Sequence, residues 1–329
     1  MKSGWLVGCL LFTMMAAAPA FAHEVRPGYL ELRQTGAESF DVLWKVPARG
    51  NLRLGIYARL PANCEATSEV VSMVRDGAYT DRWTVDCPGG LIGGTISIDG
   101  LSGTLTDTLA RIEQSDGTVQ VVRLTPASPA FVVEARPSSY AVAGTYLSLG
   151  VDHILRGIDH LLFVLALLLL VDTRRRLLAA VTAFTVAHSF TLAAATLGFV
   201  YIPQQPIEAI IALSIVFVAA EIVRRRNGQT SLTQEFPWAI AFTFGLLHGF
   251  GFAGALSEIG LPEQAIPVAL LFFNLGVEAG QLLFIAGALI LAAVARPLAS
   301  RTPTWAAQLP AYGIGAVAAF WTIERLVGF

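Results

Sequence analysis

The chain has 329 residues, of which 54% are hydrophobic and 14% are charged, and its mean hydropathy is +0.61. Soluble proteins carry about 25% charged residues, so a large share of this chain lies in a solvent other than water. This composition excludes a cytosolic enzyme, a nucleic-acid-binding protein and a disordered chain. The net charge of −2 is consistent with that exclusion.

The charged residues are unevenly distributed along the chain. Residues 23–143 carry 11 basic and 14 acidic residues, whereas the longer stretch 144–329 carries 10 of each. We therefore predict a soluble, exported domain at 23–143 and an all-α membrane domain at 144–329. The preceding residues 1–22 have the pattern of a signal peptide.

The predicted signal peptide has a basic start at Lys2, an apolar run at 6–18 and the cleavage pattern Ala20-Phe21-Ala22. The mature chain would then begin at His23, in an exported domain. A free α-amine beside an imidazole can chelate a transition metal, so His23 is a candidate metal-capture residue. The alternative is that His23 only follows the cleavage site, because the domain has no second histidine to complete a metal site.

Short segments of alternating apolar and polar residues, separated by turn residues, run from residue 25 to 133. They are residues 29–33, 40–44, 52–56, 83–85, 95–98 and 119–122. Such spacing predicts an all-β sandwich. Cys64 and Cys87 are the only cysteines left after cleavage, and an oxidising compartment favours a disulfide between them. Two buried free thiols are the alternative.

Six apolar segments are long enough to span a membrane. They are residues 150–171, 177–198, 207–223, 237–256, 266–294 and 305–326. The connections 172–176, 224–236 and 295–304 hold eight arginines, and the connections on the other side hold none. The positive-inside rule therefore predicts that the arginine-rich connections are cytoplasmic and that the β-domain and the C-terminus are exported.

Four of the five histidines lie in the predicted membrane helices: His153, His160, His188 and His248. At about 1.5 Å per residue, three histidines lie about 17 to 18 Å from the predicted cytoplasmic ends of their helices: His160, His188 and His248. Glu278 lies about 18 Å from the predicted exported end of its helix. An ionisable group in hydrocarbon costs roughly 2.5 to 3.5 kcal/mol, so polar groups that share one depth indicate a midplane site. The alternative is a set of separate interhelical hydrogen bonds.

Other polar residues follow the helical repeat. Asp159 and His160 repeat the pair Asp152 and His153 seven residues later, which puts both pairs on one helix face. A second polar stripe on another helix comprises Asn274, Glu278 and Gln281. Glu208, near a helix end, is a candidate gate.

The chemistry of these side chains is of one kind. Residues 144–329 contain no cysteine, methionine or lysine. Imidazole, carboxylate and amide groups suit Ni(II), Co(II), Zn(II) or Cu(II) rather than Cu(I). The lack of lysine also excludes a P-loop, so this chain carries no ATP-driven motor of its own.

The motif His153-x5-Asp159-His160, together with the segments TVAHSFTLA, LLHGFGFA and FFNLGVEAGQ, resembles the HupE/UreJ family of bacterial membrane proteins. The resemblance covers residues 144–326. It implies a nickel or cobalt permease linked to hydrogenase and urease maturation, located in the bacterial inner membrane. It also implies that His153, Asp159 and His160 are transport-motif residues. The family's second motif ends in a glutamate that residues 247–253 lack, and Glu278 is the candidate replacement.

The leading hypothesis is a divalent transition-metal permease, which is a transporter and not an enzyme. Its predicted midplane site comprises His160, His188, His248 and a carboxylate from Asp159 or Glu278. His153 would occupy an outer relay position, and Asn274, Gln281, Glu208 and His23 are further candidates. Nickel, cobalt and zinc all remain open as the metal. The expected partners are the metal ion and the lipid bilayer, with an exported metal donor or a second copy of the chain as candidates.

Two other hypotheses belong to different classes. An intramembrane hydrolase would hold Zn(II) with three histidines and use a carboxylate to activate bound water. Ser189, beside His188, would fit that reading. A sensor or assembly factor built around the β-domain is the third hypothesis.

Overall fold

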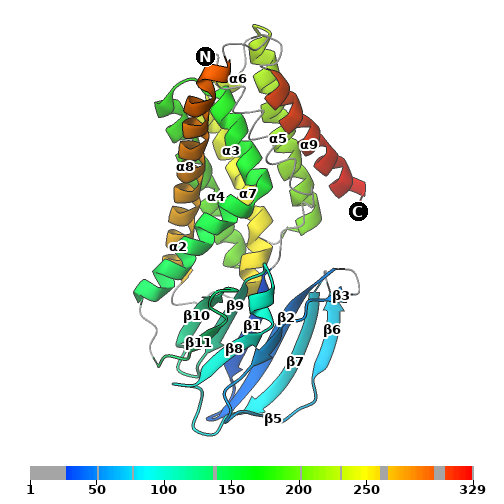
Figure 1. The fold of residues 1–329 in the computed structure, drawn as a ribbon, viewed down its shortest axis with the longest axis vertical. Helices are drawn as coiled ribbons and strands as arrows, with labels where there is room; N and C mark the ends of the chain where they lie inside the picture. The colour runs from blue at the N-terminus through cyan, green and yellow to red at the C-terminus, as the bar shows by residue number, and fades with distance from the viewer. Residues whose placement is uncertain are drawn as a thin grey trace. The chain divides into compact units, whose positions relative to one another are not determined.

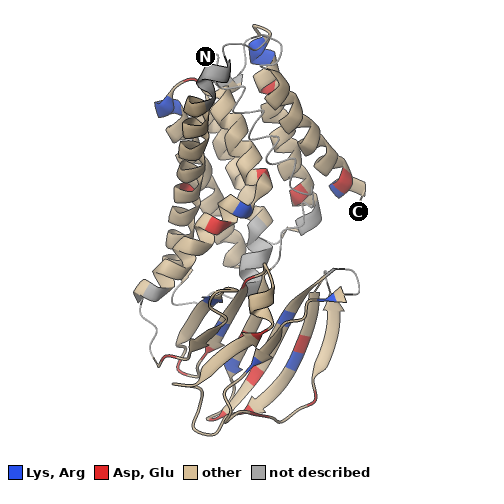
Figure 2. Ribbon diagram, in the orientation of Figure 1, with Lys and Arg blue, Asp and Glu red and all other residues tan. Residues whose placement is uncertain are grey.

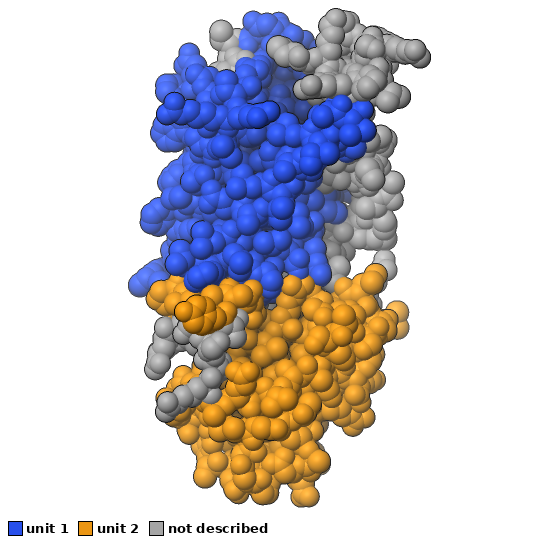
Figure 3. All heavy atoms as spheres, turned by 60° about the vertical axis from the view of Figure 1, so that its left-hand side comes forward, with its two compact units in different colours: residues 1–22, 146–258, 270–329 blue, residues 23–145, 259–269 orange. Residues whose placement is uncertain are grey.

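The computed structural model describes residues 27–49, 52–75, 78–135, 139–200, 202–229, 232–259, 266–299 and 308–327. The chain divides into two compact units, which are coloured separately in Figure 3. One unit contains the strands and the other contains most of the helical residues (Figure 1). The predicted signal peptide and His23 lie outside the described residues.

The larger sheet of the β unit has eight strands. These are β1 (Gly28–Gln34), β2 (Ser39–Arg49), β3 (Leu52–Arg53), β5 (Glu65–Ala66), β6 (Val71–Arg75), β7 (Ala78–Asp86), β9 (Thr108–Glu113) and β10 (Val119–Leu124). The strand order is β10-β9-β1-β2-β7-β5, with β3 paired to β2 and β6 paired to β7. Strand β1 runs parallel to β9, with Gly28 opposite Thr108, and antiparallel to β2.

A second sheet has the order β11-β8-β4 and comprises β4 (Tyr57–Arg59), β8 (Thr95–Asp99) and β11 (Ala130–Val132). Alternate residues of both sheets point into one hydrophobic core, because successive side chains of a strand point to opposite faces. Leu30, Val42 and Trp44 enter this core from the larger sheet, and Ile96 and Ile98 enter it from the smaller one. The described chain therefore has the expected N-terminal β-sheet region, in which two sheets share one core.

The predicted disulfide between Cys64 and Cys87 is confirmed. It joins the segment before β5 to the segment after β7, and Cys87 is fully buried in the core. The side-chain amide of Asn63 donates to the carbonyls of Pro88 and Gly90, which holds the same two segments together. A cross-link that closes a loop of this length contributes about 3 kcal/mol in the chain-entropy model.

The helical part has eight described helices. These are α2 (Ser139–Arg156), α3 (Ile158–Leu170), α4 (Arg174–Thr196), α5 (Gln204–Arg226), α6 (Leu232–Glu235), α7 (Pro237–Ile259), α8 (Ile266–Ala299) and α9 (Leu309–Val327). Helices α5 and α9 lie side by side (Figure 1). Apolar residues of α3, α4, α5 and α9 form one core, in which Leu165, Phe184 and Ile215 are almost fully buried.

Within the described residues, three helical segments are long and apolar enough to cross a membrane: Arg174–Thr196, Pro206–Arg226 and Ile266–Val294. The pair Val142–Arg156 and Ile158–Leu170 would make a fourth span if its bent halves cross together. The described part of the chain is thus a β-sheet region followed by a helical region with membrane-capable helices. The number of six spans stays a prediction.

The prediction of one continuous helix is wrong for one of the six segments. Residues 150–171 were expected to form a single span, but the chain bends by 73° between α2 and α3. The bend occurs at Gly157, which has φ −75° and ψ 94° and so leaves the helical region. Among the described residues, each of the other five predicted segments overlaps one helix, namely α4, α5, α7, α8 and α9.

Charged residues follow the division of the chain. The strands carry residues of both signs along their length, whereas the helices carry few (Figure 2). Arg174, Arg175 and Arg176 begin α4, and Arg224, Arg225 and Arg226 end α5. These arginines therefore lie at helix ends and not within the apolar middle of α4 or α5.

Candidate metal centre

The break at Gly157 brings together two histidines that stand on different helices. His153 lies in the last turn of α2 and His160 in the first turn of α3, and their ring centroids are 4.7 Å apart. A Cβ atom on Gly157 would lie 2.8 Å from the carbonyl oxygen of His153 and 2.8 Å from Nδ1 of His160. Only glycine fits this space without displacing the chain around both histidines.

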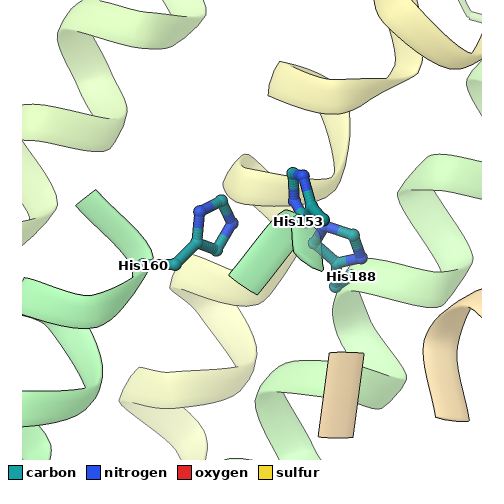
Figure 4. Close-up of side chains that lie close together, drawn as sticks. All are labelled: His153, His160 and His188. Carbon is teal, nitrogen blue, oxygen red and sulfur yellow. The ribbon is translucent and has the colours of Figure 1, made fainter. Parts of the chain in front are cut away.

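Histidines from two further helices complete a group around His160. The ring of His188 on α4 lies 6.3 Å from the His160 ring and 6.0 Å from the His153 ring. The ring of His248 on α7 lies 5.0 Å from that of His160. Ring nitrogens of His153, His160 and His188 all lie within 4.8 Å of one another (Figure 4). These three residues, with His248, are called the histidine group below.

Glycines allow the helices that carry the group to approach closely. A Cβ atom on Gly249 of α7 would overlap the hydroxyl of Thr191 and the carbonyl of His188, both on α4. On α2, a Cβ atom on Gly150 would overlap the carbonyl of Phe273 on α8. Small residues let helix backbones pack closely in membranes, and here they set the spacing of the rings.

Each of three rings is oriented through its Nδ1 atom. Nδ1 of His160 lies 3.0 Å from Oδ1 of Asp159, and Nδ1 of His188 lies 3.3 Å from Oδ1 of Asn274. Nδ1 of His248 donates to the carbonyl of Phe244 at 2.8 Å. A carbonyl oxygen only accepts hydrogen bonds, so the proton of His248 lies on Nδ1 and the lone pair on Nε2.

The proton of His188 also lies on Nδ1, and its lone pair lies on Nε2. Asn274 donates from Nδ2 to the carbonyl of Leu270 at 2.8 Å, which leaves its Oδ1 to accept from Nδ1 of His188. The Nε2 atoms of His160, His188 and His248 are buried and have no hydrogen-bond partner among the described residues. This pattern of anchored Nδ1 and available Nε2 is typical of histidines that bind metal.

Aromatic rings enclose the group. The Phe184 ring on α4 lies 5.1 Å from the His248 ring, 6.1 Å from the His188 ring and 6.3 Å from the His160 ring. His160, His188 and His248 are 5%, 0% and 1% exposed. Such burial strengthens electrostatic interactions at the group, because water is largely excluded.

The structure places the predicted site residues in three arrangements. His153, His160 and His188 form the tightest set, and His248 contacts it through His160. His153 lies beside His160 because the bend at Gly157 folds the end of α2 against α3, and its predicted relay role stays a prediction. Asp159 and Asn274 contact the group as hydrogen-bond partners of its rings.

The remaining candidates lie elsewhere. Glu278 accepts a hydrogen bond from Thr182 at 2.6 Å, and within the described part of the chain no hydrogen bond joins its carboxylate to the histidine rings. Gln281 lies 3.0 Å from the hydroxyl of Thr185. Glu208 on α5 pairs with Arg325 on α9, with 3.7 Å between Oε2 and Nε. His23 lies outside the described residues.

Some residues of the site gave no signal in the sequence. Phe184 is one of many phenylalanines in apolar helices, and nothing in its position predicts contact with three histidines. Thr182 and Thr185 precede His188 at intervals of three residues, and that spacing is the signal that points to a shared helix face. Ser189 donates to the carbonyl of Thr185 on its own helix at 2.7 Å.

The fold and the site define a class: a helical protein with membrane-capable helices that enclose a histidine group. Residues 129–325 match the family described as HupE / UreJ protein, and the chain belongs to that family. No curated protein matches the chain.

Proposed function

We propose that the protein is a divalent transition-metal permease of the nickel and cobalt type. The HupE/UreJ family is generally associated with nickel and cobalt transport, and the membrane-capable helices imply a multi-pass membrane protein with lipid and metal ions as partners. The histidine group is the proposed binding site, and the metal is the cargo of the protein.

One observation carries this proposal. The Nε2 atoms of His160, His188 and His248 are buried without a hydrogen-bond partner among the described residues, although each Nδ1 is held in place. A buried polar atom without a partner costs about 1 to 3 kcal/mol. Several such atoms in one small region favour a ligand that accepts their lone pairs, and a metal cation meets that requirement.

The proposed ligands are His153, His160 and His188, with His248 as a fourth imidazole on the side of His160. Nitrogen ligands about 2.1 Å from one zinc-sized ion lie about 3.4 Å apart in tetrahedral geometry. Binding would therefore draw the rings closer than the present 4.8 Å limit between their nitrogens. An all-imidazole set suits Ni(II), Co(II) and Zn(II), and Asp159 and Asn274 would orient the ligands.

The proposal includes the topology expected from the sequence. In this arrangement residues 1–22 are a signal peptide, the β-domain lies in the periplasm, and six spans cross the inner membrane. Reporter fusions after Pro206 and Arg226 test it, because the first should report the exported side and the second the cytoplasmic side. The reverse result would reject the six-span arrangement.

The permease is favoured over the zinc hydrolase. Ser189 uses its hydroxyl within α4, and Oδ1 of Asp159 already accepts from both the backbone and the ring of His160. A hydrolase needs a carboxylate that activates a metal-bound water, and Asp159 is better suited to orient His160.

The test is metal binding by purified protein, followed by uptake into proteoliposomes. We expect tight binding of one Ni(II) or Co(II) ion per chain and uptake that requires the protein. His160→Ala and His188→Ala should each weaken binding about 10- to 100-fold. Ser189→Ala is the matched control on the same helix and should bind as the wild type does. Unchanged stoichiometry and affinity in both histidine variants would refute the proposed site.

A further inference from the structure

A line of polar residues leads away from the histidine group along the interface of α4 and α8. It consists of three hydrogen-bonded pairs with one residue from each helix: His188–Asn274, Thr185–Gln281 and Thr182–Glu278. The paired atoms lie 3.3, 3.0 and 2.6 Å apart. One end of the line is the buried imidazole of His188, and the pair at the other end contains the carboxylate of Glu278.

The charge of Glu278 is not balanced within this line. Glu278 lies inside the apolar segment Ile266–Val294, where an ionised side chain is costly. Among the described residues, its hydrogen-bond partner is the neutral hydroxyl of Thr182, and none of them forms a salt bridge with Glu278. A carboxylate in such surroundings attracts a cation, because a hydroxyl group cannot neutralise its charge.

Burial decreases along the same line. His188 and Gln281 are 0% and 1% exposed, whereas Glu278 is half-buried and Thr182 is exposed. Thr182 precedes His188 by six residues, which is about 9 Å along α4 toward its start at Arg174. An ion at Glu278 would therefore be separate from the histidine group and closer to the end of α4 that we propose to be cytoplasmic.

We propose that Glu278, Thr182 and Gln281 form a second cation site, in which oxygen atoms hold a divalent metal ion on its way to or from the histidine group. This proposal rests on the proposed permease function. Carboxylate, hydroxyl and amide oxygens bind nickel and cobalt less tightly than imidazole does. Conduction requires binding that is weak enough to release the ion, and a weaker site beside a tight one meets that requirement.

The first test compares uptake with tight binding in the full-length protein. Glu278→Gln keeps the shape of the side chain but removes its charge. It should lower Ni(II) uptake into proteoliposomes about 10- to 100-fold, while tight binding at the histidine group stays as in the wild type. Glu324→Gln is the matched control, because it removes an exposed carboxylate on α9, and its uptake should equal that of the wild type.

A second measurement detects the oxygen site directly. Mn(II) favours carboxylate and carbonyl ligands over imidazole, and its spin resonance signal reports binding. The His160→Ala/His188→Ala double variant should still bind Mn(II), and adding Glu278→Gln should abolish that binding. Thr182→Val removes the hydroxyl group but keeps the Glu278 carboxylate and the shape of the side chain. It should therefore weaken Mn(II) binding, and it tests the site even if Glu278→Gln fails to fold.

Three results would overturn the proposal. Wild-type uptake by folded Glu278→Gln would show that the carboxylate is not needed. Loss of tight binding in that variant would place Glu278 in the histidine group. Mn(II) binding that is insensitive to both Glu278→Gln and Thr182→Val would exclude the site. Absence of tight nickel or cobalt binding by the wild type would instead refute the permease function, and this proposal with it.

Discussion

Gly157→Ala is a sharp test of the histidine group, because it adds one methyl group between two of the proposed ligands. The backbone at Gly157 has φ −75° and ψ 94°, which alanine can adopt, so the substitution imposes no backbone strain. Its effect must come from the new Cβ atom. That atom would lie 2.8 Å from both the His153 carbonyl and Nδ1 of His160.

The size of the displacement follows from these distances. Ordinary van der Waals contact of a Cβ atom begins at 3.4 Å. The His153 carbonyl and the His160 ring must therefore each move by about 0.6 Å, which disturbs the grouping of the two rings on which the proposed site depends. We expect the Gly157→Ala protein to bind Ni(II) or Co(II) about 10- to 100-fold more weakly, as for loss of a residue that orients a ligand.

The assay is calorimetric titration of the purified protein with each metal. Gly144→Ala on α2 and Gly287→Ala on α8 are matched controls, because a Cβ atom at either position meets nothing within 4 Å. Both controls should bind as the wild type does. Gel filtration establishes that all three variants fold. Wild-type affinity in folded Gly157→Ala protein would refute the assignment of His153 and His160 to one metal site.

Three further predictions concern the disulfide of the β unit, the hydrogen bond to His188 and the close approach of α4 and α7. Replacing Cys64 and Cys87 by serine should destabilise the β unit by about 2 to 4 kcal/mol, measured as faster amide hydrogen exchange in its strands, and unchanged exchange would contradict the stabilising role of the disulfide. Asn274→Leu removes the acceptor of His188 Nδ1 and should weaken metal binding about 10-fold or more by titration. Gly249→Ala should separate α4 from α7 and lower both thermal stability and metal affinity, and a variant with wild-type values would show that the close approach is not required.

The β unit shows where alternation predicts a strand and where it fails. Strands β2 and β8 were predicted because one face is buried and the other is more exposed, which gives a period of two. Strand β9 was missed because it is buried on both faces, with Leu109, Ala110 and Arg111 in succession. The expected strand at 52–56 shortens to two residues in β3.

The helical unit was predicted from its apolar runs, but its bend was not. Hydrophobic residues continue on both sides of Gly157, so composition gave no reason to divide the segment 150–171. An isolated glycine is tolerated inside a helix, and its presence alone does not predict a break. Only the structure shows the break at Gly157, where α2 and α3 meet at an angle of 73°.

By itself, the sequence determined that the chain has a β-rich part, a membrane part and four histidines in apolar segments. These conclusions depend on composition and on spacing along one element, which the order of residues specifies directly. Only the tertiary structure decided that His153 joins His160 and His188, and that Glu278 contacts Thr182 instead of the rings. Contacts between helices depend on their rotation, crossing and depth, and these are set by the packing of many side chains at once.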